Sequence, residues 1–432
     1  MKYLIVGNCA AGVNAAIEIR KRDNNGEITI LSDENFPAYW RCLISYYLAG
    51  VKTKDDLVMY PESFYKDMNI NVLLNKRAVK IDTGNKKVVC ADGTEFSYDR
   101  LLIATGGRPK LPEIKGVETN GVFCFRSIQD ARRILEIVKS GGNKAVLLGG
   151  GLIGLKATYG LKKRGLDVTL VVKSSQILSQ IVDKTAAGIV QSHLEKNGVK
   201  IKLGLDASEI NGNGRVRSIK LEDGSELPAD IIIIGKGVSS NLEIAQGTGL
   251  KTNLRIIVNS YLETNLPGIY AAGDVAETKD LLTGISTINA LWTAAVEQGK
   301  IAGANMAGDG IEYEGSMAMN SAEFFDLPLI SFGITRPKPG EGYEEIIKPG
   351  PESETYKKIV LKDNKLVGAI LVRKIENAGI YLALARKKVD VSRIKDILGE
   401  DSFNFSKVAH LLDIPENYIR EIATSHNLSA EK

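Results

Sequence analysis

The stretch Gly7-Asn8-Cys9-Ala10-Ala11-Gly12 decides the fold of this chain, because it is a glycine-rich turn between a strand and a helix. The apolar run 3–6 precedes the turn, and residues with helical spacing follow it. Glycines let the backbone approach a pyrophosphate closely, and the amino end of the following helix offers N–H groups to the anion. The stretch therefore predicts a dinucleotide-binding unit at the start of the chain.

A second glycine-rich turn, Gly149-Gly150-Gly151-Leu152-Ile153-Gly154, follows the apolar run 145–148 in the middle of the chain. After each turn come a second strand, an Asp-Gly hairpin, and an aspartate that leads into another apolar strand. Self-similarity over such a long stretch indicates two copies of one nucleotide-binding fold. Two copies predict two bound nucleotides, and a flavoprotein that reacts with a nicotinamide cofactor is the simplest interpretation.

The composition is that of a globular protein with more than one domain. The chain has 432 residues, of which 44% are hydrophobic and 25% are charged, and its net charge is +4. No basic cluster is dense enough to predict nucleic-acid binding. No apolar run approaches the roughly 18 residues that span a bilayer, and Met1 leads directly into a strand. We therefore expect a cytoplasmic protein without a membrane span or signal peptide.

The cysteines and histidines give no signal for a metal. The four cysteines, Cys9, Cys42, Cys90 and Cys124, lack the spacing of an adjacent redox pair or of an iron–sulfur cluster motif. The chain has only three histidines. The sequence therefore predicts no metal site, and any metal in the reaction has to be brought by a partner.

The order of motifs predicts that the second copy is inserted in the first. An apolar strand within 266–274 ends in Gly-Asp, and a helix is expected over about 290–306. We expect one domain from residues 1–110 and 243–315, a second from 111–242, and a mixed α/β domain from 316–432. That third domain is expected to contain a β-hairpin over 356–372, helices over 378–386 and 392–398, and a short helix after Leu412.

The chain resembles the pyridine nucleotide–disulfide oxidoreductases, flavoproteins with two dinucleotide-binding domains. The motifs that carry the resemblance are the two glycine turns, Ala-Thr-Gly-Gly-Arg-Pro at 104–109 and Tyr-Ala-Ala-Gly-Asp-Val at 270–275. The chain is similar to the branch that contains NADH oxidase, rubredoxin reductase, the flavin part of nitrite reductase and the flavin subunit of phenylglyoxylate dehydrogenase. Its segments 320–325 and 356–361 are similar to the interface domain of these enzymes, which implies a homodimer.

The resemblance implies that the first domain holds FAD and the second NAD(P)H, with hydride transfer between the two cofactors. One of two acidic residues, about 20 residues after the first turn, would accept hydrogen bonds from the adenosine ribose of FAD. The residues implied in FAD binding are Gly7, Ala11, Gly12, Asp33, Glu34, Arg41, Val79, Ala104, Thr105, Gly106, Gly273, Asp274, Trp292 and Thr293. Those implied in NAD(P)H binding are Gly149, Gly151, Ile153, Gly154, Lys173 and Gly237.

Three positions depart from the family pattern. Cys9 replaces the middle glycine of the first turn, where we expect a small packed residue. Lys156 stands where the family often has a glutamate near the nicotinamide. The acidic residue expected after the second strand of the second domain is missing, and Val172 is followed by Lys173. Without that carboxylate nothing repels a 2′-phosphate, so both NADH and NADPH stay open.

Which electron acceptor the sequence predicts depends on whether Cys42 is a redox-active cysteine. Related NADH oxidases and coenzyme A disulfide reductases have a redox cysteine eight residues before a glycine, as Cys42 lies before Gly50. A neighbouring cation such as Arg41 would make this thiol reactive by lowering its pKa. However, those enzymes usually follow the cysteine with glycine, where this chain has Leu43. The pattern Tyr-x-Arg-x-x-x-Ser over 39–45 is more similar to the nitrite reductase and rubredoxin reductase branch, which requires no cysteine here.

Three functions stay open at this point. The first is an FAD-dependent NAD(P)H oxidoreductase that exchanges electrons with an iron–sulfur carrier, ferredoxin or rubredoxin, or with a partner subunit. The second is a single-cysteine NADH oxidase or coenzyme A disulfide reductase that uses Cys42. The third is a non-catalytic flavin-binding redox scaffold. The catalytic candidates are Cys42, Arg41 and Lys156.

Overall fold

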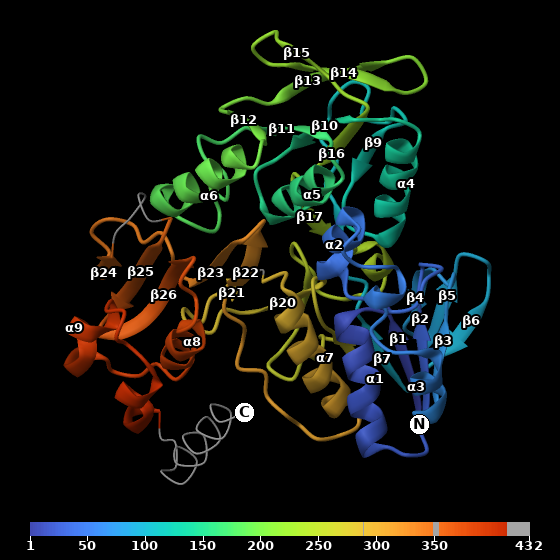
Figure 1. The fold of residues 1–432 in the computed structure, drawn as a ribbon. Helices are drawn as coiled ribbons and strands as arrows, with labels where there is room; N and C mark the ends of the chain where they lie inside the picture. Colours follow the sequence, from blue (N-terminus) through green and yellow to red (C-terminus); the bar gives the residue numbers. More distant parts are fainter. Residues whose placement is uncertain (288, 349–353, 413–432) are drawn as a thin grey trace, which may run out of the picture. The chain divides into compact units, whose positions relative to one another are not determined.

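The computed structural model describes residues 1–287, 289–348 and 354–412, and the chain forms two compact units (Figure 1). The first unit joins Met1–Ser175 to Gly198–Ser316, and it contains both glycine turns. The second unit joins Gln176–Asn197 to the segment that begins at Met317. The short helix expected after Leu412 lies outside the described residues.

The first glycine turn belongs to a five-stranded parallel sheet with the order β19-β7-β1-β2-β3. Its strands are β1 (Lys2–Val6), β2 (Glu27–Leu31), β3 (Ile70–Leu73), β7 (Arg100–Ile103) and β19 (Ile269–Ala271). Strand β19 pairs with β7 in register, with Ile269 opposite Leu101. The first sheet is therefore completed by a distant segment, as the sequence predicted.

The second glycine turn belongs to another five-stranded parallel sheet, with the order β12-β11-β10-β16-β9. Its strands are β9 (Val122–Cys124), β10 (Lys144–Leu148), β11 (Asp167–Val172), β12 (Lys200–Leu203) and β16 (Ile231–Ile234). The order β7-β1-β2-β3 in the first sheet is repeated as β16-β10-β11-β12 in the second. This repetition confirms the predicted α/β class with two copies of one nucleotide-binding fold.

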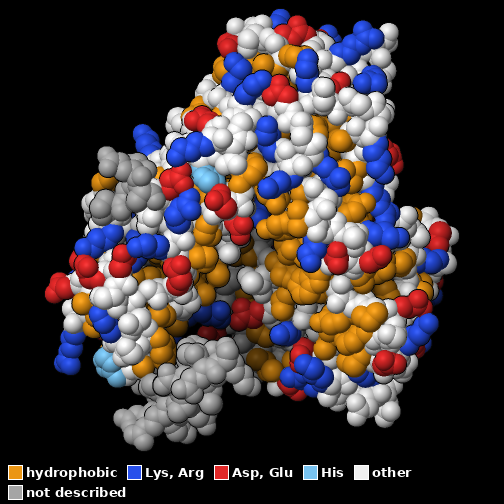
Figure 2. Space-filling model, viewed as in Figure 1, with side chains coloured by type: hydrophobic (Ala, Val, Ile, Leu, Met, Phe, Trp, Pro, Cys, Tyr) orange, Lys and Arg blue, Asp and Glu red, His pale blue; other side chains and the backbone are white. Residues whose placement is uncertain are grey.

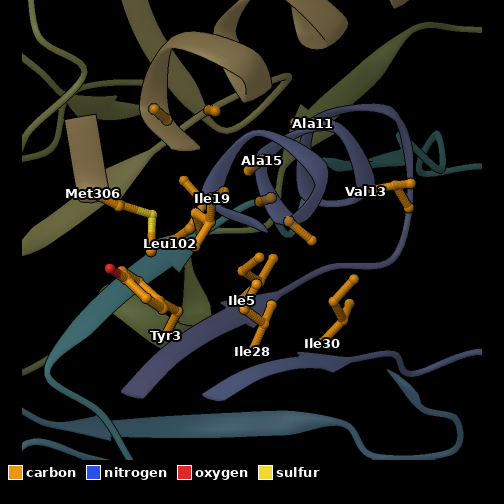
Figure 3. Close-up of a cluster of buried hydrophobic side chains, with 14 of the residues drawn as sticks. Tyr3, Ile5, Ala11, Val13, Ala15, Ile19, Ile28, Ile30, Leu102 and Met306 are labelled. Carbon is orange, nitrogen blue, oxygen red and sulfur yellow. The ribbon is translucent and has the colours of Figure 1, made fainter. Parts of the chain in front are cut away.

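Two helices pack closely in the first copy, α1 (Ala10–Arg22) and α7 (Trp292–Met306). Apolar side chains of α1, β1, β2, β7 and α7 meet in one buried cluster, shown in Figure 3. Ile5 and Ile19 are fully buried in this cluster, and each such side chain contributes about 1.5–3 kcal/mol to folding. The buried cluster thus packs strand β1 and helix α1, which flank the first glycine turn, against the rest of the first copy.

Besides α1 and α7, the described part of the first unit contains four α-helices. They are α2 (Ile44–Ala49), α3 (Glu62–Asp67), α4 (Ile128–Lys139) and α5 (Leu152–Lys163). This unit also contains three small sheets. One contains β4 (Ala78–Asp82), β5 (Lys87–Cys90) and β6 (Glu95–Ser97), and another contains β13 (Ala207–Gly212), β14 (Val216–Leu221) and β15 (Glu226–Pro228). The third contains β18 (Ile256–Ile257), β20 (Ala276–Lys279) and β21 (Ser286–Thr287). Strands β8 (Gly107–Pro109) and β17 (Val238–Ser240) pair where the chain enters and leaves the second copy.

The second unit is built on an antiparallel sheet with the order β22-β23-β26-β25-β24. Its strands are β22 (Met319–Phe324), β23 (Leu327–Gly333), β24 (Tyr343–Lys348), β25 (Tyr356–Lys362) and β26 (Lys365–Val372), and its helices are α6 (Lys184–Lys196), α8 (Ala378–Arg386) and α9 (Lys395–Leu398). The hairpin β25–β26 and helix α8 confirm the predicted mixed α/β character. Among the helices that the structure describes, none is both long and apolar enough to cross a bilayer.

Candidate functional site

The first glycine turn has the geometry of an anion cradle. Gly7 has φ of +128°, and a Cβ there would lie 2.1 Å from the Ala104 carbonyl oxygen. A Cβ on Gly12 would lie 1.9 Å from the Gly7 carbonyl oxygen, so only glycine fits at either position. Helix α1 begins without a side chain that caps its first turn. Both polar side-chain atoms of Asn8 are buried and have no hydrogen-bond partner within the described residues. These uncommitted polar groups fit a pyrophosphate.

The second glycine turn has the same geometry. Gly149 has φ of +115°, and a Cβ there would lie 2.4 Å from the Gly235 carbonyl oxygen. A Cβ on Gly154 would lie 2.3 Å from the Gly149 carbonyl oxygen, whereas one on Gly151 would meet open space. Helix α5 also begins without a side-chain cap, and Ile153 in its first turn is 40% exposed. The second copy therefore offers a second cradle for a pyrophosphate.

Arg41 connects several residues beside the first turn. Its Nε donates to Cys9 Sγ at 3.3 Å, and its Nη1 donates to the Arg126 carbonyl oxygen at 3.3 Å. Its Nη2 pairs with Glu34, which also accepts a hydrogen bond from the Tyr39 hydroxyl at 2.9 Å. Burial alone would lower the pKa of Arg41, but its interactions with Cys9, Tyr39 and Glu34 outweigh burial and raise it. Of the two acidic candidates for the ribose, Glu34 thus lies in this network, whereas Asp33 is exposed.

A second polar group lies beside the end of β19. The Asp274 carboxylate accepts a hydrogen bond from Arg126 at 3.0 Å, and its backbone carbonyl accepts one from the Ser240 hydroxyl at 2.8 Å. Gly273 lies against Ala11, because a Cβ on Gly273 would be 3.3 Å from the Ala11 Cβ. The structure therefore places Gly273 and Asp274, which follow β19, beside the first glycine turn.

Arg126 is a residue that the sequence analysis missed. It contacts both Arg41 and Asp274 from the segment just before α4. The missed signal is the capping box of α4, in which Ser127 and Asp130 satisfy each other's backbone N–H groups. A Ser-x-x-Asp pattern before an apolar helix predicts a helix start, and the charged residue before such a start is a candidate ligand for an anion.

The chain's two tryptophans lie together. The ring centroids of Trp40 and Trp292 are 5.3 Å apart, with an interplanar angle of 38°. Trp292 is the first residue of α7, and Thr293 beside it is exposed. Thr105 donates to the Asn241 carbonyl oxygen at 3.1 Å, and the Asn241 N–H donates to Gly106. These contacts join the segment after β7 to the segment after β17.

Three further residues predicted to bind FAD or NAD(P)H, Val79, Gly237 and Lys173, are not part of the glycine turns themselves. Val79 is 44% exposed on β4, which belongs to a different sheet from the first turn. Gly237 follows β16 with φ of +92°, and a Cβ there would meet open space. Lys173 directly follows β11 and is exposed. The structure gives positions for these residues but tests none of their roles.

Helix α2 links the Cys42 segment to the helix of the second turn. The Tyr46 ring lies 5.8 Å from the Tyr159 ring, and the Lys156 Nζ lies 5.2 Å from the Tyr46 ring centroid. Arg164 donates to the Leu48 carbonyl oxygen at 2.7 Å, near the carboxyl end of α2. Hydrophobic side chains gather around α2 on the face shown in Figure 2. Lys156 therefore lies between the two copies rather than on an isolated helix surface.

The Cys42 thiol reaches the surface, but burial of part of the residue disfavours its ionisation. Desolvation raises its pKa, while its own backbone N–H and Lys156 oppose that effect only in part. The pKa of Cys42 therefore lies above its ordinary value, which disfavours the thiolate. Arg41, the cation expected to activate Cys42, is instead engaged by Glu34 and Cys9.

Comparison with known proteins agrees with this architecture. Residues 1–299 match the family described as pyridine nucleotide-disulphide oxidoreductase, and residues 319–389 match the C-terminal domain of rubredoxin NAD+ reductase. An NADH oxidase of Methanocaldococcus jannaschii is 37% identical over 345 residues, which is 78% of this chain and 76% of that protein. A rubredoxin-NAD(+) reductase of Pseudomonas putida is 34% identical over 311 residues, which is 71% of this chain and 80% of that protein.

A nitrite reductase of Bacillus subtilis is 32% identical over 400 residues, or 92% of this chain, but the chain spans only 48% of that enzyme's length. Among solved structures, an NAD-dependent persulfide reductase from A. fulgidus superposes with a TM-score of 0.86 at 28% identity, covering 92% of this chain and 79% of that one. A ferredoxin reductase from Rhodopseudomonas palustris gives 0.86 at 26% identity, covering 94% and 99%. The chain therefore belongs to the pyridine nucleotide-disulphide oxidoreductase family and is an FAD-dependent NAD(P)H oxidoreductase.

Proposed function

We propose that this oxidoreductase exchanges electrons between NAD(P)H and an iron–sulfur carrier protein of the ferredoxin or rubredoxin type, or a partner subunit, through FAD. The observation that carries the proposal is that Arg41, the cation expected to activate Cys42, is held instead by Glu34 and Cys9. A two-electron route through this residue needs a thiolate, and the raised pKa of Cys42 disfavours one. A carrier protein that accepts electrons one at a time needs no thiol.

The residues around the first turn would hold FAD. The uncapped amino end of α1 would bind the pyrophosphate, and Glu34 would accept hydrogen bonds from the adenosine ribose. Arg41 and Arg126 would supply positive charge to the phosphates, and Asp274 would hydrogen-bond the ribityl or pyrophosphate region. When bound, FAD supplies the capacity to take a hydride from NAD(P)H and to release the two electrons singly. One NAD(P)H thus reduces two one-electron carriers, with release of one proton.

The second copy would hold NAD(P)H on the turn at Gly149 and the uncapped amino end of α5. We propose that the FAD domain comprises 1–110 and 243–315, the NAD(P)H domain 111–242, and the interface domain 316–432. We also propose a homodimer formed through the interface domain. A cytoplasmic location stays a prediction from the sequence.

The names of two relatives support a carrier protein as the acceptor. The Pseudomonas relative is named for rubredoxin, and the Rhodopseudomonas structure is that of a ferredoxin reductase. The match of residues 319–389 to the C-terminal domain of rubredoxin NAD+ reductase extends this support to the second unit. These names describe other proteins, and they guide the choice of acceptor for an experiment.

A second candidate is a two-electron enzyme that uses Cys42 to reduce oxygen, peroxide or a small disulfide or persulfide. The observation that favours it is Lys156, whose charge lowers the pKa of Cys42 against the effect of burial. The persulfide reductase from A. fulgidus, at 28% identity, points the same way. A non-catalytic scaffold is the least favoured, because the chain is an oxidoreductase by family.

An anaerobic two-step experiment separates the candidates. The holoprotein is reduced with NADH or NADPH in a stopped-flow instrument, and then mixed with oxidised rubredoxin, oxidised ferredoxin or coenzyme A disulfide. Carrier reduction by the wild type and by Cys42→Ser at equal rates supports the proposal. The matched control is Cys90→Ser, because Cys90 lies on β5 and belongs to neither glycine turn. If Cys42→Ser alone abolishes turnover with every acceptor, the carrier proposal is wrong and the thiol route is correct.

A further inference from the structure

Three charged side chains gather at the carboxyl end of the second parallel sheet. Lys173 follows β11, Asp206 lies between β12 and β13, and Lys236 follows β16. The Asp206 Oδ1 accepts a hydrogen bond from Lys236 Nζ at 2.5 Å, and Asp206 Oδ2 lies 3.6 Å from Lys173 Nζ. In sheets of this type, nucleotides bind at the carboxyl ends of the strands. The cluster is therefore placed where the second nucleotide is expected.

Asp206 is committed to the protein rather than to a ligand. It is only 8% exposed, and its Oδ1 also accepts the N–H of Ala207 at 2.8 Å. Burial tends to raise the pKa of Asp206, but the hydrogen bonds from Lys236 and Ala207 outweigh burial and lower it. The carboxylate is therefore ionised at neutral pH and is neutralised by Lys236, whose side chain is 24% exposed.

Lys173 is the exposed member of the cluster. Its side chain is 73% exposed, and its 3.6 Å separation from Asp206 is too long for a strong hydrogen bond. The two lysines and one aspartate together carry one positive charge, which is presented to solvent by Lys173. The residue before it, Val172, is apolar and 2% exposed, so the last residue of β11 carries no carboxylate, and Asp206 is the carboxylate whose charge Lys236 balances.

We propose that Lys173 binds the 2′-phosphate of NADP(H), and that Asp206 and Lys236 act as positioning residues that hold Lys173 at the end of β11. This inference rests on the proposed placement of NAD(P)H in the second copy, and it selects NADPH over NADH. Asp206 orients the ammonium group of Lys173 through their ion pair. Lys236 neutralises Asp206 and so cancels the repulsion that this carboxylate would otherwise exert on the phosphate.

Calorimetric binding of two adenosine phosphates to the FAD-loaded protein tests the proposal without electron transfer. The probes are 2′,5′-ADP, which has the 2′-phosphate, and 5′-AMP, which lacks it. We expect 2′,5′-ADP to bind at least about tenfold more tightly, with the preference falling as salt rises. Lys173→Met should remove about tenfold of the affinity for 2′,5′-ADP and leave 5′-AMP unchanged, whereas Lys173→Arg should keep the preference.

The positioning residues have their own variants. Lys236→Met should weaken 2′,5′-ADP binding several-fold, because an unneutralised Asp206 carboxylate then faces the phosphate. The matched control is Lys200→Met, which removes an exposed lysine of the neighbouring strand β12 that pairs with Asp167 at 2.8 Å. This control should bind both probes as the wild type does. Retained FAD absorbance verifies that each variant is folded.

Two results would overturn the proposal. Equal affinity for the two probes, unchanged in Lys173→Met, would show that no 2′-phosphate site exists at Lys173. Weaker 5′-AMP binding in Asp206→Asn would show that Asp206 accepts a ribose hydroxyl and that the site is built for NADH. Neither result concerns the electron acceptor. The proposed function would fail in a different way, as a loss of carrier reduction with both NADH and NADPH.

Discussion

Replacing Gly299 with alanine tests the close contact of α1 and α7 that supports the first cradle. A Cβ at this position would lie 2.2 Å from the Ala11 carbonyl oxygen and 2.8 Å from its Cα. Real Cβ atoms essentially never approach closer than 3.0 Å, so the contact to oxygen falls short by 0.8 Å. Both obstructing atoms are backbone, and neither can rotate away. The helices therefore have to separate.

The expected cost follows from two opposing effects. Overpacking of this kind costs roughly 1–3 kcal/mol, and a backbone obstacle places the cost near the upper end. Alanine is favoured over glycine inside a helix by about 1 kcal/mol, which offsets part of it. We expect a net loss of about 2 kcal/mol in unfolding free energy, or roughly 2–3 °C in Tm for a chain of this length. Because Ala11 belongs to the first glycine turn, FAD affinity should fall as well.

The assay is thermal unfolding of the FAD-loaded and FAD-free proteins, followed by circular dichroism and by flavin fluorescence. The matched control is Gly188→Ala in α6, where an added Cβ has no heavy atom within 4 Å. This control should leave Tm unchanged or raise it, since only the helix preference acts. If Gly299→Ala also leaves Tm and FAD affinity unchanged or raises them, the close packing of α1 against α7 is refuted.

Three further predictions address the site. Alkylation of Cys42 by iodoacetamide should reach half its maximal rate above pH 8.5, the pKa of an unstructured thiol, because burial raises the pKa of Cys42. Lys156→Met should move that midpoint higher still, because the lysine charge lowers the pKa of Cys42. A wild-type midpoint below pH 8 would contradict the raised pKa. Arg126→Leu should weaken FAD binding about tenfold, measured by equilibrium dialysis, because it removes a charged partner of Asp274; an unchanged Kd would exclude Arg126 from the cradle. FAD binding to the apoprotein should quench tryptophan fluorescence in both Trp40→Phe and Trp292→Phe, because the two rings lie together and Trp292 begins helix α7, which packs against Ala11 of the first turn. Quenching that is kept in one of these variants and lost in the other would contradict a shared location.

The sequence by itself determined the parts of this protein that depend on local backbone geometry. The glycine turns could be predicted because a positive φ and a close backbone approach require glycine at Gly7 and Gly149, whatever the rest of the chain does. The strands could be predicted from apolar runs, and their division between two similar folds from the repetition of one motif order. The completion of the first sheet by β19 was predictable because a recognisable Gly-Asp, at 273–274, closely follows that strand.

Only the tertiary structure decided which charged groups meet. The pairs of Arg126 with Asp274 and of Lys236 with Asp206 join residues that are 148 and 30 positions apart. Each partner is an ordinary charged residue in its local sequence, and nothing in that sequence specifies the other. Electrostatic effects depend on distance and burial in the folded chain, so the raised pKa of Cys42 and the single net charge at Lys173 could not be predicted before the strands were assembled.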